Sequence, residues 1–516
     1  MESKNSLGWN NLFYVFFLSC IIVSIAIANN SNNSNNSNTF YEGTTDKPIN
    51  LDPFSKQKNQ SEEDIGALVF NGLFKINSNG MPVVDLANKW EITPDGRTYT
   101  VEIKENIFWH DGKILTTKDI DHSISYLKNN HAFNKNNSIW KNISVYFNDK
   151  KTIIFHLQEP YAPFLSNLTF PIIPSHIPIN NYNVSSTDFK MHSIVGTGPF
   201  VIQSISDKKA MFVRNGSYYL GVPKIKNFEL IFYQTKKQLS NAMNNNELSA
   251  SIALLPSNFT TTDHEKYKLL KHTMNESLIL FMNNLREPFN SVEVRRNIKA
   301  IIKSPEFFNK MRENSLIDVV PGNLFHSYKW ALQFHNSELI EQSIMKSLNN
   351  PKDAYSLVML NNLNIQNISE QIIKSLKNNK INFDIKIADN SNELISIITN
   401  RDYDFLILNI KNSLDPDPYY MWHTSQIIYP GINFSGLNDK FTDSLIEDAR
   451  KNIDYYERAQ AYNEFKQRFN DLSPAIILSH PVYSYIINQS ISGPKNDTLF
   501  KLSDRFRDIH LWEFFK

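Results

Sequence analysis

The chain has 516 residues, of which 41% are hydrophobic, and its 53 basic and 52 acidic side chains leave a formal net charge of +1. So close a balance gives no strong field for nucleic acid, and we expect no nucleic-acid partner. The single cysteine, Cys20, excludes a disulfide framework, a cysteine-rich zinc site and a cysteine nucleophile in the folded body.

The N-terminal residues 1–28 predict export. Residues 12–28 contain no charged side chain, Lys4 lies upstream, and Ala26-Ile27-Ala28 has the small residues that a signal peptidase reads. At about 17 residues, the apolar run falls between a signal peptide and the shortest membrane-spanning helix. It is either cleaved as a signal peptide or retained as an anchor in the inner membrane, and both alternatives place the body in the periplasm or another extracytoplasmic space.

Residues 29–39 consist almost entirely of Asn and Ser. They offer few apolar groups to bury, so we expect a flexible tether between the apolar segment and the folded body. The alternative is low-complexity sequence without a role.

Beyond the tether, the first half of the chain has strand and hairpin patterns. Residues 90–103 and 145–155 alternate apolar and polar side chains on either side of a turn sequence, and each predicts a β-hairpin. Between them, Thr116 followed by Asp119 resembles a capping box and predicts the start of a helix.

The second half alternates strand and helix patterns. Strands and helices are expected in turn at residues 355–360, 368–376, 381–387, 394–398 and 405–408. This β-α-β-α-β order favours a parallel sheet covered by helices. Two long helices, around residues 441–449 and 462–469, precede a last apolar strand at residues 475–478.

Ligands of such sheets bind beyond the carboxyl ends of the strands, so the loop after Leu408, residues 409–418, is the predicted site. It contains Asp415-Pro416-Asp417-Pro418. In the structural alternative, the prolines fix an extended turn and the aspartates only cap it.

No pattern in the sequence favours catalysis or a metal. There is no Gly-x-Ser-x-Gly elbow, and Gly196 and Gly198 lack the Lys-Ser/Thr of a phosphate loop and predict a tight turn. His110-Asp111 with Asp119 and His122 is interpreted as a turn and a helix start and not as a metal cluster. We expect no catalytic residues, no metal and no cofactor.

Short motifs follow one another along the body in a fixed order. They are Leu51-Asp52-Pro53, Phe70-Asn71-Gly72-Leu73, Leu86-Ala87-Asn88-Lys89-Trp90-Glu91, Asp95-Gly96-Arg97, Phe108-Trp109-His110-Asp111-Gly112, Val195-Gly196-Thr197-Gly198-Pro199-Phe200 and Asn283-Asn284. Each is weak alone, but their order over about 450 residues is specific. In this series the chain resembles the bacterial extracellular solute-binding proteins of family 5, the oligopeptide, dipeptide and nickel receptors of ABC importers.

The resemblance implies an α/β fold of the periplasmic-binding-protein type II, with two lobes and an extra β-rich subdomain in lobe one. Lobe one would span residues 40–282 with the subdomain at about 81–194, lobe two residues 283–480, and residues 481–516 would return to lobe one. It also implies the substrate-binding component of an ABC importer, which binds peptides or a related small solute between the lobes and has permease subunits as partners. The alternatives are a membrane-tethered peptide-binding sensor or chaperone and, with less support, an exported enzyme on the same scaffold.

The resemblance also implies ligand contacts in the 409–418 loop. In peptide receptors of the family, an Asp four positions before the first proline of this loop binds the α-ammonium of the peptide, and a Trp seven positions before it flanks the pocket. Asn412 and Asn409 hold these positions here. Because an amide offers no charge, Asp415 is the alternative partner for an ammonium group, and Asp417 borders the ligand in the same loop.

A second predicted contact follows Leu51-Asp52-Pro53. In the family this segment pairs with the peptide backbone as a strand edge, which points to Gln57, Lys58 and Asn59. An exposed polar loop is the alternative.

Overall fold

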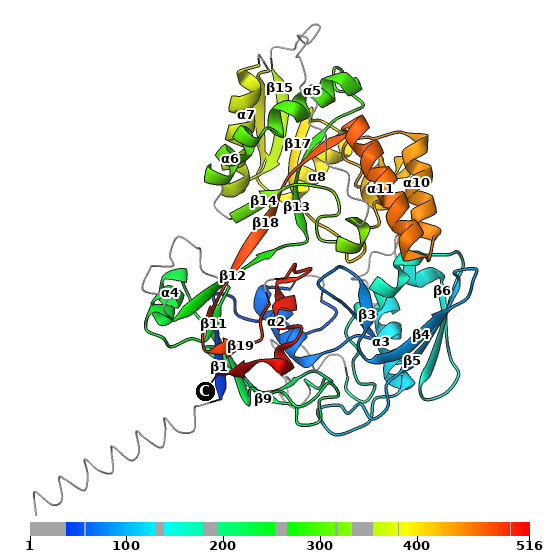
Figure 1. Cartoon of the computed structure of the whole chain (residues 1–516), viewed down its shortest axis with the longest axis vertical. Helices are drawn as coiled ribbons and strands as arrows, with labels where there is room; N and C mark the ends of the chain where they lie inside the picture. Colours follow the sequence, from blue (N-terminus) through cyan, green and yellow to red (C-terminus); the bar gives the residue numbers. More distant parts are fainter. Residues whose placement is uncertain are drawn as a thin grey trace, which may run out of the picture.

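The computed structural model describes residues 38–55, 58–129, 139–178, 194–252, 266–314, 318–332, 354–379, 381–495 and 497–515. The predicted signal peptide or anchor, nearly all of the predicted tether and Gln57 lie outside these residues. Two lobes lie one above the other in Figure 1, with lobe one below and lobe two above. Within the described residues, no helix is both long and apolar enough to span a membrane.

Lobe one contains one end of a mixed sheet that continues into lobe two. Here β1 pairs in parallel with β10 and β11, and β8, β9 and β10 follow as antiparallel neighbours. The elements of this part are β1 (Thr39–Thr44), α2 (Gln60–Val69), β8 (Phe200–Ile205), β9 (Lys209–Arg214), β10 (Asn227–Phe232), α4 (Lys236–Asn244), β11 (Ala250–Ser251) and β12 (Tyr267–Thr273).

The predicted β-rich region forms a separate four-stranded antiparallel sheet in the order β4-β5-β7-β6. It comprises β4 (Ala87–Ile92), β5 (Thr98–Ile103), α3 (Thr117–Asn129), η1 (Ile139–Asn142), β6 (Ile143–Phe147), β7 (Thr152–Leu157) and η2 (Ala162–Thr169), with the small hairpin β2 (Phe74–Ile76) and β3 (Pro82–Val84) beside it. Both predicted hairpins are confirmed. At the start of α3, the Thr116 N–H donates to Asp119 Oδ2 over 2.8 Å, as the capping pattern predicts.

Lobe two has helices on both faces of its part of the sheet. Its elements are β13 (Glu276–Met282), α5 (Val292–Ile302), α6 (Pro305–Asn314), β14 (Asp318–Pro321), η7 (Lys329–Leu332), β15 (Tyr355–Leu360), α7 (Leu363–Lys377), β16 (Phe383–Ala388), α8 (Ser391–Asn400), β17 (Phe405–Lys411), α9 (Tyr419–Trp422), η8 (Thr424–Gln426), α10 (Lys440–Lys451) and α11 (Tyr455–Leu472). Helices α5, α6 and α7 pack on one face, and α8, α10 and α11 pack on the other. The predicted parallel pairing is confirmed for β15, β16 and β17.

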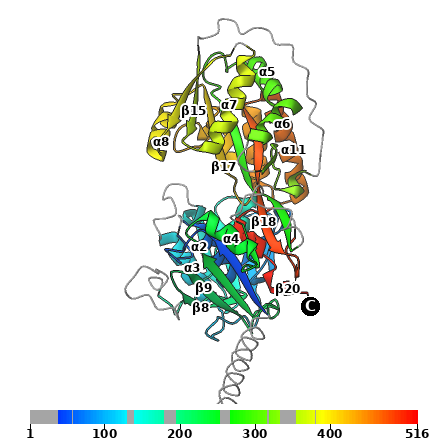
Figure 2. The ribbon, with the colours of Figure 1, turned by 90° about the vertical axis from the view of Figure 1, so that its left-hand side faces the viewer.

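One long strand, β18 (Ala475–Asn488), passes from lobe two into lobe one, and Figure 2 shows it crossing the junction. Its first residues pair with β13 and its last residues with β11 and β12. The strand predicted at residues 475–478 is thus too short, because residues 479–482 pair with β14 and the pairing with β12 follows from Val482 on. Strand β13, which the predicted boundary at residue 282 assigned to lobe one, pairs with β17 of lobe two.

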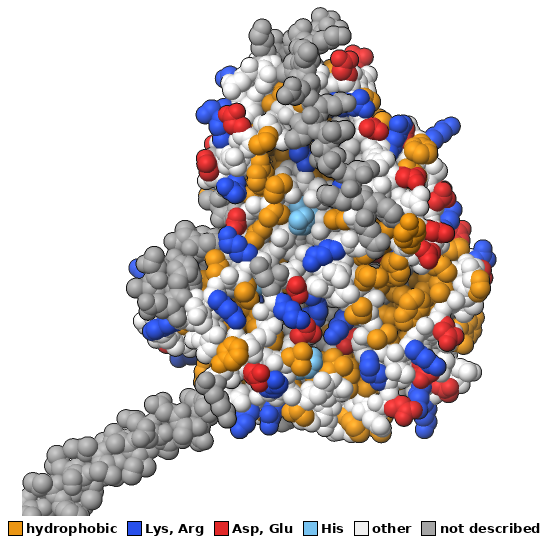
Figure 3. Space-filling model, in the orientation of Figure 1, with side chains coloured by type: hydrophobic (Ala, Val, Ile, Leu, Met, Phe, Trp, Pro, Cys, Tyr) orange, Lys and Arg blue, Asp and Glu red, His pale blue; other side chains and the backbone are white. Residues whose placement is uncertain are grey.

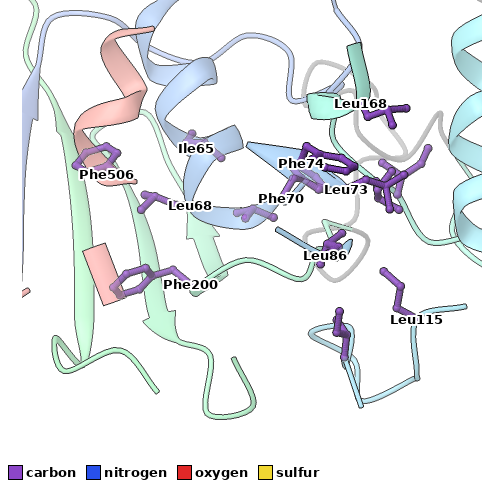
Figure 4. Packing of buried hydrophobic residues seen from close by; sticks show 14 of the residues in the cluster. Ile65, Leu68, Phe70, Leu73, Phe74, Leu86, Leu115, Leu168, Phe200 and Phe506 are labelled. Carbon is purple, nitrogen blue, oxygen red and sulfur yellow. The ribbon is translucent and has the colours of Figure 1, made fainter. Parts of the chain in front are cut away.

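The C-terminal elements pack against the N-terminal ones. They are β19 (Ile491–Ser492), η9 (Leu502–Phe506), η10 (Ile509–Leu511) and β20 (Glu513–Phe514). Figure 4 shows Phe506 beside Leu68 of α2 and Phe200 of β8 in the buried core. The buried guanidinium of Arg505 donates to Glu42 Oε1 (3.0 Å) and Asp64 Oδ2 (2.6 Å), which ties this end to β1 and α2.

The predicted turn around Gly198 lies against the end of α2. The Gly198 N–H donates to Val69 O over 2.8 Å, and a Cβ at residue 198 would lie 2.4 Å from Leu68 O. Glycine is needed here because the two backbones approach so closely.

Candidate ligand-binding site

Two neighbouring cavities lie where the lobes meet. The lobe-two cavity, of about 320 Å³, is bounded by β13, β18 and the loop after β17. The lobe-one cavity, of about 360 Å³, is bounded by α2, the β2–β3 hairpin and η9. Ser413 lines the first cavity and Leu414 the second, so the cavities adjoin at this loop. Across the junction, Lys411 Nζ of β17 lies 3.8 Å from Glu63 Oε1 of α2.

A third cavity, of about 510 Å³, opens between the β-rich subdomain and α10. Tyr161 lines it from lobe one, and Glu447 and Arg450 line it from lobe two. Tyr420 lines both this cavity and the lobe-two cavity. The space between the lobes therefore continues past α9 toward the β-rich subdomain.

Asn412 is the first residue after β17 and lines the lobe-two cavity. Its backbone N–H donates to Asn275 O (3.0 Å) and its Nδ2 to Ser277 Oγ (3.0 Å). Among the described residues, none donates a hydrogen bond to its Oδ1. The side chain is held in place by neighbours while its carbonyl oxygen can accept a bond from a ligand.

The two loop aspartates turn toward arginines of lobe two. The buried Arg458 of α11 holds Asp415 with Nη2 at 2.5 Å from Oδ1 and Nη1 at 3.1 Å from Oδ2. Arg450 Nε of α10 lies 3.2 Å from Asp417 Oδ2, and its guanidinium is 4.2 Å from the centre of the Tyr419 ring. Burial raises the pKa of Asp417. Both carboxylates are therefore engaged inside the lobe.

These aspartates also cap their own turn. The Asp417 N–H donates to Asp415 Oδ1 (3.0 Å), and the Tyr419 N–H donates to Asp417 Oδ1 (3.1 Å). This geometry matches the structural alternative for the Asp-Pro-Asp-Pro motif. Ligand contacts by Asn412, Asp415 or Asp417 stay predictions.

Asn409 lies in β17 and not in the loop, because Ile410 and Lys411 continue the pairing with β13. Its Nδ2 donates to Glu276 Oε2 over 2.9 Å at an exposed position. Asn409 is not among the described residues that line the lobe-one or the lobe-two cavity. The predicted loop at residues 409–418 therefore begins only at Asn412.

In the segment before α2, Lys58 and Asn59 have different surroundings. Asn59 caps α2, since its side chain accepts from the Glu62 N–H (3.0 Å) while Glu62 Oε2 accepts from the Asn59 N–H (3.0 Å). Lys58 lines the lobe-one cavity, and its Nζ donates to Pro53 O over 2.6 Å. Burial and the nearby Lys501 lower the pKa of Lys58 to about 8.

Two histidines that the sequence analysis did not single out line the lobe-two cavity. The rings of His326 and His480 stack with centroids 4.5 Å apart. His480 Nδ1 lies 2.8 Å from Glu276 O, and its Nε2 lies 3.1 Å from the Asn323 nitrogen and 3.0 Å from the Asn323 carbonyl oxygen. Burial lowers the pKa of His480 to about 4. No local pattern could have joined these residues, because only the fold brings β18 beside residue 326.

Among the described residues, no group of three or more His, Cys, Asp or Glu side chains is placed to hold an ion. The absence of a metal stays a prediction. His110 Nε2 lies 3.0 Å from Gly198 O, and Asp119 caps α3.

Two lobes joined by a crossing strand, with cavities between them, define a solute-binding protein of the periplasmic type. The model of the bacterial extracellular solute-binding proteins, family 5 Middle, matches residues 81–427, and the chain belongs to this family.

Individual relatives are distant in sequence. The chain is 21% identical to the dipeptide-binding protein of Escherichia coli (strain K12) over 463 residues, which cover 83% of this chain and 86% of that protein. Its identity to the probable D,D-dipeptide-binding periplasmic protein DdpA of the same organism is 21% over 423 residues, or 79% of this chain and 81% of DdpA.

Solved structures agree with the fold prediction. The ABC transporter substrate-binding protein CtaP of Listeria monocytogenes superimposes with a TM-score of 0.74 at 20% identity, covering 93% of this chain and 99% of CtaP. NikZ of Campylobacter jejuni, solved with Ni(L-His), has a TM-score of 0.66 at 20% identity and covers 92% and 99%. The two-lobe type II fold predicted from the sequence is confirmed.

Proposed function

We propose that this protein captures a peptide or a related small solute between its lobes outside the cytoplasm and delivers it to the permease subunits of an ABC importer. The adjoining cavities at the lobe junction carry the proposal, because residues of both lobes line the space. Relatives named for dipeptides and oligopeptides support a peptide. The solute would leave chemically unchanged.

Native mass spectrometry of the protein purified from its own host tests the binding function. A tightly bound solute should appear as a discrete mass increment that is lost on denaturation, and fragmentation should identify it. Preparations that never carry a solute, and that bind none from a peptide pool, would contradict the peptide assignment. Loss of uptake on deletion of the permease would separate an importer receptor from a tethered sensor or chaperone.

Hinge closure is the second part of the proposal. Between β12 and β13, residues 274–275 link the lobes, and β18 crosses beside them, so a bend at these two connections would move one lobe against the other. Small-angle scattering should give a smaller radius of gyration with saturating ligand than from a confirmed empty state. An unchanged radius would argue against closure.

Export through residues 1–28 is the third part. Protease added to intact spheroplasts should digest the body while a cytosolic marker survives. An N-terminal sequence beginning at Asn29 would show cleavage, whereas an intact N-terminus in the membrane fraction would show an anchor. Protection equal to that of the marker would contradict export.

A further inference from the structure

The charged residues around the lobe-one cavity are not evenly matched. Seven Lys, Arg, Asp and Glu side chains line it, of which four are basic and three acidic: Lys58, Lys75, Lys501, Arg507, Glu63, Asp85 and Asp504. Figure 3 shows Lys and Arg side chains across the middle of one face, around the junction of the lobes. Which of these charges is available to a ligand depends on the partners that each already has.

Two of the three acids are engaged by neighbours within lobe one. Asp85 accepts from Tyr219 Oη (2.5 Å) and from Asn71 Nδ2 (3.1 Å). Asp504 Oδ2 accepts from the backbone N–H groups of Phe500 (3.0 Å) and Lys501 (2.9 Å).

The ion pairs of the other charged side chains leave more unpaired basic than acidic groups in the wall of the lobe-one cavity. Glu63 faces Lys411 across the cleft at 3.8 Å, and Arg507 Nη2 lies 3.6 Å from Asp504 Oδ2. Within the described parts of the chain, no carboxylate lies within 4.0 Å of the Nζ of Lys58, Lys75 or Lys501. In this part of the chain the three ammonium groups therefore form no direct ion pair, although Asp52, Glu63 and Glu62 act on Lys58 from a greater distance and oppose the lowering of its pKa by burial.

Of the three lysines, Lys58 is the one whose charged form is destabilised most by the lack of a direct ion pair. The Lys58 side chain is half-buried, and among the described residues its Nζ donates one hydrogen bond, to the carbonyl of Pro53. A cation withdrawn from water needs an opposite charge close by or several acceptors, and one carbonyl with carboxylates beyond 4.0 Å supplies this only in part. A ligand that brings negative charge to this spot would remove the deficit.

Lobe two supplies no competing acid from its predicted binding loop. Asp415 and Asp417 are bound to Arg458 and Arg450, and Asn412, which lines the lobe-two cavity, is an uncharged amide. The loop thus offers little to attract an ammonium group into the cleft.

We propose that Lys58 binds an oxyanion group of the ligand, a carboxylate or a phosphate, in the lobe-one cavity, with Lys501 adding to the local positive potential. The inference rests on the proposed binding function and names the ligand's charged group. In a peptide that group is the C-terminal or a side-chain carboxylate. In a smaller solute it is the anion itself.

A comparison of peptide acids with peptide amides tests the inference. An equimolar pool of tripeptides with free C-termini and the same pool with C-terminal amides are offered to the wild type. The tripeptide that binds best is then measured by calorimetry both as the free acid and as the amide. The acid should bind at least tenfold more tightly than the amide. Lys58→Met should remove this preference by weakening the acid alone, and Lys58→Arg should keep it.

Lys118→Met is the matched control, because Lys118 is exposed on α3 and lies away from the cavity. It should leave the preference unchanged, and circular dichroism should show that each variant is folded. The acid–amide comparison in the wild type needs no variant, so a Lys58 variant that fails to fold does not block the test.

The outcomes separate this inference from the proposed function. Equal affinity for acid and amide overturns the anion site and leaves peptide binding intact. If neither pool binds, thermal shifts with inorganic phosphate and citrate decide: a shift that Lys58→Met abolishes supports the anion site and contradicts peptide capture. No response to either anion overturns both.

Discussion

The two walls of the cleft hold their charges in opposite ways. On the lobe-two wall, Asp415 and Asp417 each meet an arginine from α10 or α11, so the charge is balanced before any ligand arrives. On the lobe-one wall, Lys58 and Lys501 have no carboxylate within 4.0 Å among the described residues. An ionisable side chain in a ligand-binding loop therefore gives little information about the ligand until its partners in the fold are known.

The difference comes from the elements behind each wall. Helix α11 presents Arg458 from inside the lobe, where the guanidinium also donates to Ala449 O (3.0 Å) and Tyr462 Oη (2.7 Å). The first turn of α2 brings Glu62 and Glu63 instead, and Glu62 is used to cap the helix. Lobe two has a cation within ion-pair distance of each loop acid, whereas among the described residues lobe one has no carboxylate within 4.0 Å of Lys58 Nζ.

The largest expected effect follows from removing Arg458, the buried cation that pairs with Asp415. Arg458→Met leaves the carboxylate of Asp415 buried without its bidentate partner, and breaking such a pair costs about 3–5 kcal/mol. Urea unfolding monitored by circular dichroism should show this loss. The double variant Arg458→Met with Asp415→Asn should recover part of it, because no buried charge then remains.

Arg468→Met is the control on the same helix. Arg468 donates to Asp439 Oδ1 over 2.7 Å, but its side chain is 34% exposed whereas that of Arg458 is 2% exposed. A partly exposed pair contributes about 1 kcal/mol or less. Similar losses for the two arginine variants would contradict the view that the lobe-two charges are sealed inside the fold.

A second prediction concerns pH and the buried His480 beside the lobe-two wall. Burial lowers its folded-state pKa to about 4, while the unfolded ring titrates near 6.5. The unfolded chain then binds more protons between these values, so stability is full above about pH 6.5 and falls as the pH drops toward 4. At pH 4 this one group should account for about 2–3 kcal/mol.

Unfolding free energies measured from pH 7.5 to 4 for the wild type and His480→Gln would detect this effect. The variant should lose stability less steeply with acid, whatever its stability at pH 7.5. His156→Gln, at an exposed position of β7, should keep the wild-type slope. Equal slopes for His480→Gln and the wild type would refute a buried neutral His480.

A third prediction sharpens the account of the lobe-one wall. Because the pKa of Lys58 is about 8, its ammonium is charged at pH 6.5 and mostly neutral at pH 9.5 in the empty protein. The preference for a peptide acid over its amide should fall from at least tenfold at pH 6.5 to about threefold or less at pH 9.5. Calorimetry at the two pH values measures it.

Lys58→Arg gives the matched control, because a guanidinium stays protonated throughout this range. Its acid preference should persist at pH 9.5. A wild-type preference that does not change with pH would assign the anion contact to a group other than Lys58.

The sequence predicted the strands and helices of lobe two better than it predicted the partners of the charged side chains in that lobe. Strand β15 coincides with the predicted residues 355–360, and β16 and β17 lie close to their predicted ranges, since each strand has a local apolar pattern. The pattern did not predict exposure, because β16 is an edge strand on which Ile385 is 47% exposed. Local periodicity determines a strand, but its place in the sheet depends on the whole chain.

The candidate site was harder to predict for the same reason. The loop after β17 was located from the sheet order, but Asp417 pairs with Arg450 and Asp415 with Arg458, which lies 43 residues beyond it, and no local signal links them. Asn59 is different, because Asn59 followed by Glu62 is a capping-box pattern visible in the sequence. It was interpreted as a ligand contact, and the helix that it caps was not predicted.

The smallest expected effect tests the lobe-two wall from the side of the ligand. Asn412 stands where peptide receptors of the family place the Asp that binds the peptide's ammonium, and the buried Asp415 is already held by Arg458. Acetylation of a bound peptide's N-terminus should therefore cost less than about 1 kcal/mol, whereas loss of a charge-assisted bond to a buried carboxylate costs about 1.5–3 kcal/mol. Calorimetry on free and acetylated forms of one peptide measures the difference. A tenfold or larger loss that Asp415→Asn abolishes would show that Asp415 leaves Arg458 to meet the ligand, and the contrast between the two walls would then fail.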